Sequence, residues 1–128
     1  MSLATLLAIG SGGFIGAVLR AYLNGLISHR LPHDLPFGTL GVNLVGSFIM
    51  GVLVAYFMYT TYFSLHVKSF LSTGILGALT TYSTFAIESV MLFTGGHFAL
   101  AAANIMLNAL GTVLMAGVGF RLAGALLH

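Results

Sequence analysis

The sequence alternates long apolar stretches with short polar connections. The apolar stretches run from Leu3 to Ile27, Thr39 to Tyr59, Val67 to Phe93 and Phe98 to Leu127. Each has at least the roughly 20 residues that an α-helix needs to cross a bilayer. We therefore predict an all-α membrane protein in which residues 1–128 form one domain of four transmembrane helices, with the two chain ends on the same side.

The first apolar stretch is predicted to be a retained span. No basic residue precedes it, and Leu3 to Leu19 is longer than the apolar region of a signal peptide. Gly12 and Gly16 have the small-xxx-small spacing that favours close packing of helices in lipid. Arg20 lies toward the far end of this span, where it is either an anchor that reaches the interface or a positive charge in an anion vestibule.

The third stretch contains a polar run punctuated by glycine, from Thr73 to Phe85. Glycine lowers helix propensity, and serine and threonine hydroxyls compete for backbone hydrogen bonds, so the run predicts a break in the helix. Unwound backbone at membrane depth is tolerated only where protein buries it or where it lines a wet cavity. The break therefore indicates an ion or substrate site.

Two other spans carry matched polar stripes at positions i, i+4 and i+8, which lie on one helix face. The stripes are Thr39, Asn43 and Ser47 in the second span and Asn104, Asn108 and Thr112 in the fourth. One such stripe is either interhelical glue or a water-facing track. Two matched stripes in a small protein favour the track.

The third span continues beyond the break with aromatic and acidic positions. Tyr82 and Phe85 are three residues apart, and Phe85 and Glu88 share a helix face. Aromatic pairs at this spacing are typical of core packing. Glu88 is the only glutamate, so it is either a functional intramembrane carboxylate or an acid near the membrane edge.

Composition narrows the function classes. Hydrophobic residues make up 59% of the chain and charged residues 5%, against about 25% charged in soluble domains. The net charge of +2 is too small for a phosphate-binding face, which argues against nucleic acid as a partner. The absence of cysteine excludes thiol chemistry and disulfides. With one glutamate and one aspartate and no phosphate loop, we expect no enzyme.

The remaining polar groups suit a small ion. Amides, hydroxyls and aromatic ring edges can meet an anion, whereas carbonyls freed by an unwound helix coordinate cations. Lys68 and Arg121 lie toward the terminal side of the membrane, and Arg20 and Arg30 lie toward the other. This balance of two against two predicts that the protein inserts in both orientations.

Three motifs carry a resemblance to a known family. They are Gly12 to Ala17 with Arg20, Gly38 to Ser47, and Gly74 to Phe85 with Glu88. In this order, and over nearly the whole chain, the sequence resembles the fluoride channel family known as CrcB or Fluc. The resemblance implies a passive channel that exports cytoplasmic fluoride across the bacterial inner membrane.

The same resemblance implies an antiparallel, dual-topology homodimer with two fluoride pores along the subunit interface. It also implies a structural sodium ion at the dimer centre. The backbone carbonyls of Gly77 and Thr80 would hold this ion, each contributing twice by symmetry.

The resemblance further implies which residues form the fluoride pathway. Tyr82 and Phe85 match the phenylalanine box of the family, with Tyr82 at a position that is usually phenylalanine, and Asn43 matches the pore asparagine. The other matching positions are Arg20, Ser83, Thr84, Glu88, Asn104, Asn108 and Thr112.

Two alternatives to a channel differ in mechanism. A small multidrug-resistance-like exporter is also a four-span protein, but its proton coupling needs an acid that is typically in the first span, and here that span has none. A non-transporting membrane scaffold predicts that the two polar stripes only hold helices together.

Overall fold

The computed structural model describes residues 1–127, which contain helices and connecting loops but no strand. Four helical segments are long and apolar enough to cross a membrane: Leu3–Arg30, Phe37–Tyr59, Leu65–Thr94 and Phe98–Leu127. The first, second and last are the single helices α1, α2 and α6. The four predicted spans are confirmed, and the largest difference in a boundary is that α1 ends at Arg30 rather than Ile27.

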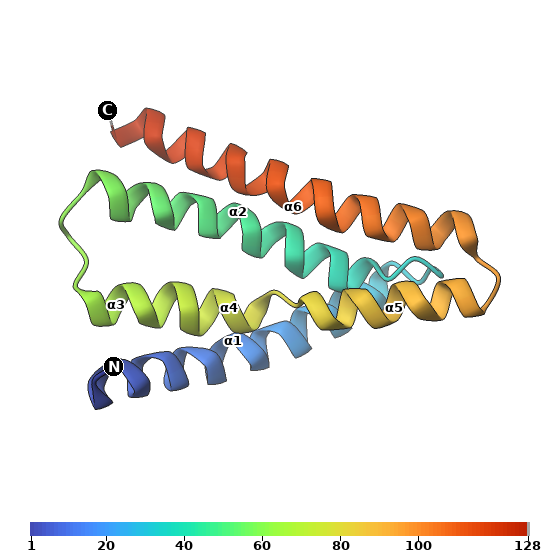
Figure 1. Cartoon of the computed structure of the whole chain (residues 1–128), viewed down its shortest axis with the longest axis horizontal. Coiled ribbons are helices and arrows are strands. Elements are labelled where there is room, and N and C mark those ends of the chain that lie inside the picture. The colour runs from blue at the N-terminus through green and yellow to red at the C-terminus, as the bar shows by residue number, and fades with distance from the viewer. Residues whose placement is uncertain (128) are drawn as a thin grey trace.

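Short caps and loops fix the connections between the helices. The Ser2 hydroxyl accepts a hydrogen bond from the Thr5 N–H at the start of α1, and Ser64 does the same for Val67 after the second loop. These contacts satisfy backbone donors that a helix start leaves without intrahelical partners. The two chain ends lie at the same end of the bundle, as predicted (Figure 1).

The third span is interrupted, which confirms the predicted break. It consists of α3 (Leu65–Ser69), the π-helical η1 (Phe70–Leu76), α4 (Gly77–Leu79) and α5 (Tyr82–Thr94). Between α4 and α5, Thr80 and Thr81 have extended backbone, with φ/ψ of −85°/155° and −145°/123°. The π-helical turn was not predicted from the sequence.

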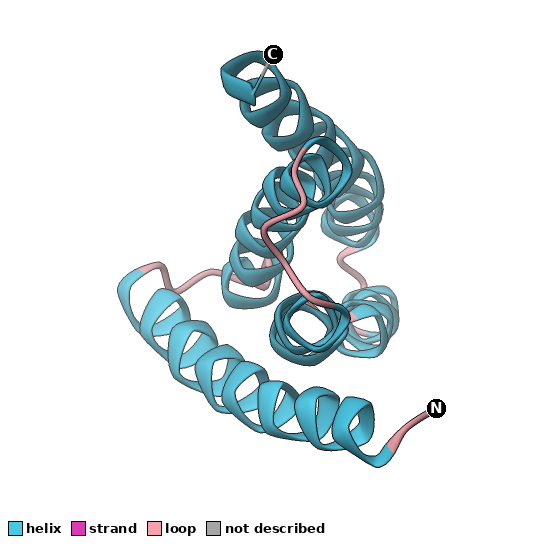
Figure 2. Ribbon diagram, turned by 90° about the vertical axis from the view of Figure 1, so that its left-hand side faces the viewer, coloured by secondary structure: helices cyan, strands magenta, loops and turns pink. Residues whose placement is uncertain are grey.

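Small residues allow the helices to approach closely. Helix α2 packs along α6, where a Cβ on Gly51 would clash with the Ala116 carbonyl. Helix α1 is inclined to the other helices and packs on η1 and α4 (Figure 2). At this contact Gly12 and Gly16 are buried, and a Cβ on either would clash with backbone of η1. The predicted packing face is therefore confirmed.

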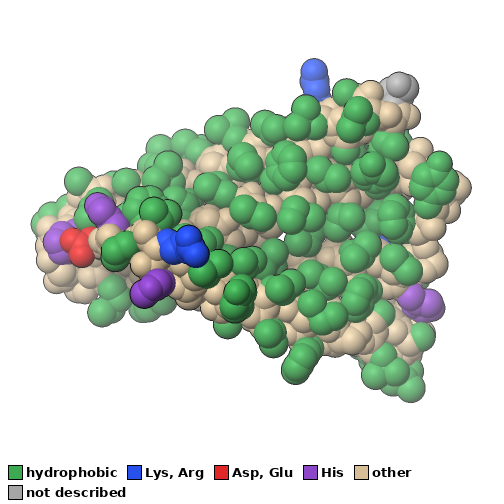
Figure 3. Space-filling view, turned by 180° about the vertical axis from the view of Figure 1, so that it is seen from behind, with side chains coloured by type: hydrophobic (Ala, Val, Ile, Leu, Met, Phe, Trp, Pro, Cys, Tyr) green, Lys and Arg blue, Asp and Glu red, His purple; other side chains and the backbone are tan. Residues whose placement is uncertain are grey.

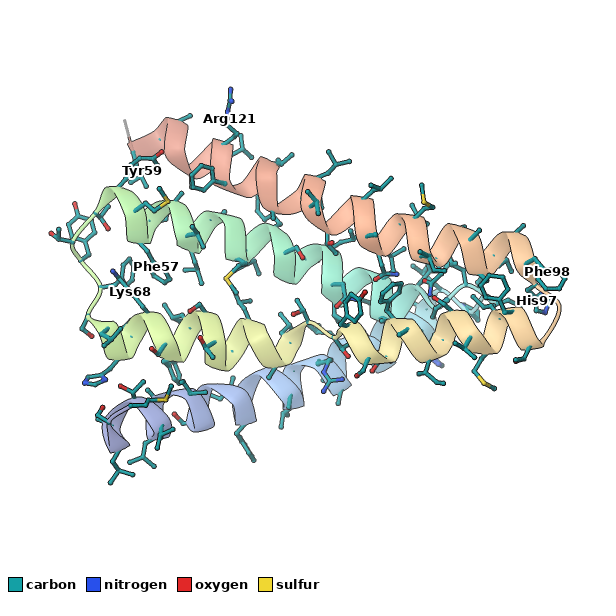
Figure 4. The ribbon with its side chains drawn as sticks, in the orientation of Figure 1. Phe57, Tyr59, Lys68, His97, Phe98 and Arg121 are labelled. Carbon is teal, nitrogen blue, oxygen red and sulfur yellow. The ribbon has the colours of Figure 1, made fainter. Side chains whose placement is uncertain are left out.

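The outer surface suits a lipid environment. Hydrophobic side chains cover most of the face seen in Figure 3, and most of the charged and histidine side chains visible there lie toward its two ends. At the end that carries the termini, the Lys68 Nζ lies 5.7 Å from the centre of the Phe57 ring, and Arg121 points away from the bundle, while His97 lies at the opposite end (Figure 4). The chain is a multi-pass membrane protein.

Candidate functional site

A cavity of about 460 Å³ opens beside the break in the third span. Residues from α2, from the break, from α5 and from α6 line it, so the two polar stripes and the break meet at one place. The lining residues are Asn43, Ser47, Thr80, Thr81, Tyr82, Phe85, Ile105, Asn108, Ala109 and Thr112. Six of these are residues for which the sequence predicted a role in ion binding or in the fluoride pathway.

Asn43 binds the backbone of the break. Its Oδ1 accepts from the Thr81 N–H at 2.7 Å, and its Nδ2 donates to the Thr81 carbonyl at 3.0 Å. The same Nδ2 donates to Asn108 Oδ1 at 2.9 Å. The Asn43 side chain is buried, so these bonds satisfy an amide that would otherwise lack partners.

The hydrogen bonds continue from Asn108 along the bundle interior. The Asn108 Nδ2 donates to the carbonyl and to the Oδ1 of Asn104, at 2.9 and 3.0 Å. The Asn104 Nδ2 donates to Ser89 Oγ, and the Ser89 hydroxyl donates to the Phe85 carbonyl, each at 2.9 Å. We call Asn43, Asn108, Asn104 and Ser89 the amide relay. It connects the break to the backbone of Phe85.

The break frees two backbone carbonyls from their helical partners. In a continuous helix the Gly77 carbonyl would accept from the Thr81 N–H, and the Thr80 carbonyl from the Thr84 N–H. Here the Thr81 N–H donates to Asn43, and the Thr84 N–H donates to Thr81 Oγ1 at 3.3 Å. The structure therefore provides carbonyl oxygens of the kind that coordinate a cation.

Arg20 lies beside the break rather than near the far end of its span. Its Nε donates to the Ala78 carbonyl at 2.9 Å, and the side chain is half-buried. Helix α1 continues to Arg30, beyond the predicted end at Ile27, and packs on α4, so Arg20 lies at this packing contact and not at the helix end. Arg20 thus satisfies a further carbonyl of the break and places a positive charge there.

The predicted aromatic pair is formed within one chain. The rings of Tyr82 and Phe85 lie 5.2 Å apart between centres at an interplanar angle of 80°, which is an edge-to-face arrangement. Phe85 is 8% exposed, whereas Tyr82 is 82% exposed. Phe85 is therefore held by the bundle, and Tyr82 extends from it.

Besides Arg20 and Asn104, three further predicted pathway residues lie outside the cavity lining. Glu88 lines a separate hollow of about 270 Å³ with Asp34 and His97, and its Oε1 is buried without a hydrogen-bond partner in the described chain. Ser83 is exposed, and the Thr84 hydroxyl accepts from Thr81 Oγ1 at 3.0 Å. The pathway role of these residues stays a prediction.

Two residues that were not assigned to the fluoride pathway also belong to this region. Ser47 lines the cavity, and within residues 1–127 its hydroxyl makes no hydrogen bond. The polar stripe of the second span contains Ser47, so the sequence carried a signal for it. Ser89 carried no such signal, because a serine near a helix end is ordinary until the structure shows its bond to Asn104.

Comparison with known proteins gives a consistent family. Residues 7–120 match the family model described as CrcB-like protein, Camphor Resistance. The chain is 79% identical over 120 residues to the fluoride-specific ion channel FluC of Sulfurimonas denitrificans, covering 94% of this chain and 93% of that one. It is 48% identical to the protein of the same name from Nautilia profundicola, with 94% of each chain covered. It is 45% identical to that of Campylobacter jejuni, with 92% and 96% covered. The chain belongs to the CrcB family.

Proposed function

We propose that this protein is a fluoride-selective ion channel that lets cytoplasmic fluoride leave a bacterial cell down its gradient. The observation that carries the proposal is the 79% identity, over nearly the full length of both chains, to a protein named a fluoride-specific ion channel. The protein is a channel and not an enzyme. The weak acid HF enters cells as a neutral molecule and dissociates inside, so a passive path for the anion is sufficient to remove it.

The cavity has the chemistry that a small, strongly hydrated anion requires. Ser47 and Tyr82 offer hydroxyl groups, and Phe85 and Tyr82 offer ring edges, which carry the positive part of the aromatic quadrupole. Arg20 adds a positive charge beside the break, which raises the local concentration of anions. A narrow path of such donors would replace the water around fluoride and exclude the larger chloride.

The functional unit proposed here is an antiparallel homodimer, with two pores along the interface between the chains. Supporting this, one chain leaves the cavity beside the break open and leaves Tyr82 82% exposed. A second copy would cover this face and complete each pathway. The pathway in each pore comprises the cavity residues together with the predicted positions Arg20, Ser83, Thr84, Glu88 and Asn104.

A sodium ion at the centre of the dimer fits the residues of the break. The carbonyls of Gly77 and Thr80 have lost their helical donors, and carbonyl oxygen is a suitable ligand for a hard cation. Two carbonyls from each chain would give four ligands. The bound ion would hold the two breaks together by electrostatic attraction to these oxygens.

The proposal is tested with the purified full-length protein in liposomes loaded with potassium fluoride or potassium chloride. After addition of a potassium ionophore, we expect fluoride efflux at an ion-selective electrode, no chloride efflux, and no need for a proton gradient. A proton-coupled exporter would require the gradient, and a scaffold would give no efflux. Equal release of the two halides would contradict selectivity.

A further inference from the structure

The hydrogen bonds of the amide relay can run in only one direction. A backbone N–H can only donate, so the Asn43 atom that meets the Thr81 N–H must be the oxygen. Its nitrogen then faces Asn108, which must present its own oxygen in return. The Asn108 nitrogen in turn faces the Asn104 carbonyl, which can only accept. Backbone groups at separate points thus impose the same orientation on the side-chain amides.

Because of this fixed orientation, Asn43 and Asn108 have few amide protons left with which to bind an anion in the cavity. The Asn43 nitrogen has two protons and donates to the Thr81 carbonyl and to Asn108. The Asn108 nitrogen makes two bonds to Asn104. Because the side chains of all three asparagines are buried, the hydrogen bonds between them polarise and strengthen one another. The relay therefore holds Asn43 in place more firmly than its bonds to Thr81 could do alone.

The Asn43 oxygen also competes with the Gly77 carbonyl for the N–H of Thr81. The Thr81 N–H that it accepts is the donor that would close the helix onto the Gly77 carbonyl. At the same contact α2 comes close to the break, since a Cβ on Gly46 would clash with the Thr80 methyl group. Binding of Thr81 by Asn43 therefore keeps the extended backbone at Thr80 and Thr81.

We propose that Asn43 is a positioning residue that holds the helix break open, and that Asn108, Asn104 and Ser89 fix its orientation. Asn43 acts on the ion path through the Thr81 backbone, by keeping the Gly77 carbonyl without its helical donor. This rests on the proposed function for its effect on transport, whereas the effect on the backbone concerns the chain alone. The asparagines thus combine the two roles left open for the polar stripes, since they join helices and shape the path.

The test measures the backbone at Thr81 separately from fluoride transport. NMR of the full-length protein in lipid gives the Cα and Cβ shifts of Thr80 and Thr81, which report extended or helical conformation. We expect extended values in the wild type. In Asn43→Leu the Thr81 shifts should move toward helical values as its N–H pairs with the Gly77 carbonyl, and fluoride efflux should be lost. Ser47→Ala, one turn along the same helix face, is the matched control and should leave the Thr81 shifts unchanged.

A second variant separates positioning from direct contact with the ion. In Asn43→Asp one carboxylate oxygen can still accept from the Thr81 N–H, so Thr81 should keep its extended shifts. The other oxygen replaces the donor to the Thr81 carbonyl and to Asn108, and the added charge reduces efflux. Should Asn43→Leu fail to assemble, Asn43→Ser is used, because its shorter side chain cannot span both Thr81 groups. Unchanged Thr81 shifts in the Leu and Ser variants would overturn the proposal. Absence of fluoride efflux in the wild type would instead contradict the channel, with the shift changes still supporting the positioning role.

Discussion

At the scale of single residues, Phe85 and Tyr82 differ in how they are held. Phe85 is buried, and its carbonyl accepts the last hydrogen bond of the amide relay, so its backbone is tied to α6 through Ser89 and Asn104. Tyr82 touches Phe85 edge-to-face but is otherwise exposed in one chain. A substitution of Phe85 should therefore alter the fluoride pathway, whereas the position of Tyr82 should tolerate other side chains.

We expect Phe85→Ile to abolish or sharply reduce fluoride efflux while the proposed dimer still assembles. Isoleucine keeps apolar bulk but has no ring edge to face an anion. Efflux is measured in liposomes, and assembly by size-exclusion chromatography. Phe57→Ile is the matched control, because Phe57 lies at the terminal end of the bundle against Phe63 and Lys68. If Phe85→Ile released fluoride at the wild-type rate, the Phe85 ring would not be part of the pathway.

Tyr82→Phe should retain fluoride transport. The substitution removes one hydroxyl and keeps the ring that packs edge-to-face on Phe85. The Tyr82 hydroxyl makes no hydrogen bond within residues 1–127, so its loss leaves no protein group without a partner. Complete loss of efflux would show that fluoride needs this hydroxyl as a donor.

At the scale of elements, the fit of α1 against the third span depends on two glycines. A Cβ on Gly16 would clash with the Ile75 carbonyl in η1, whereas a Cβ on Gly13 would meet nothing within 4 Å. Gly16→Ala must therefore push α1 away from the break, and with it Arg20, which binds the Ala78 carbonyl. The two substitutions add the same methyl group three residues apart.

We expect Gly16→Ala to destabilise the folded protein by about 1–3 kcal/mol, the usual effect of overpacking a tight contact. Gly13→Ala should leave stability unchanged or raise it slightly, because alanine favours a helix over glycine by about 0.5–1 kcal/mol. The temperature midpoint of unfolding in one detergent measures this difference. Equal midpoints for the two variants would mean that α1 does not pack closely at Gly16.

The elements also show what the sequence could and could not predict. The lengths of the apolar stretches were sufficient to predict the four spans. The glycine, serine and threonine residues between Thr73 and Phe85 were sufficient to predict the break. The contact of Arg20 with the Ala78 carbonyl was not foreseen, because the packing of α1 on α4 has no signature in the spacing of residues along one helix. The pairing of Asn43 with Thr81 was not foreseen, since helical periodicity shows which residues share a face but not which partner uses their hydrogen bonds.

At the scale of the whole molecule, the structure changes the count of charges that set orientation. Arg20 binds the Ala78 carbonyl beside the break and lies within α1, so it is not a loop residue. Lys68 and Arg121 lie toward the terminal side of the membrane, and Arg30 at the end of α1 lies toward the other. The remaining excess is a single positive charge, which is a weak determinant of topology.

Dual insertion is the most direct test of the antiparallel dimer. The chain contains no cysteine, so a single introduced cysteine reports the side on which it lies. Tyr62→Cys places the thiol in the loop between α2 and α3, and His97→Cys places it at the opposite end of the bundle. In intact cells, a thiol reagent that cannot cross the membrane should label about half of each variant, because comparable numbers of chains face each way. Permeabilised cells, in which the reagent reaches both sides of the membrane, should give full labelling and serve as the control.

Full labelling of one variant and none of the other would show a single orientation. An antiparallel dimer cannot form from chains that all face the same way, so that result would overturn the proposed assembly even if fluoride efflux were intact.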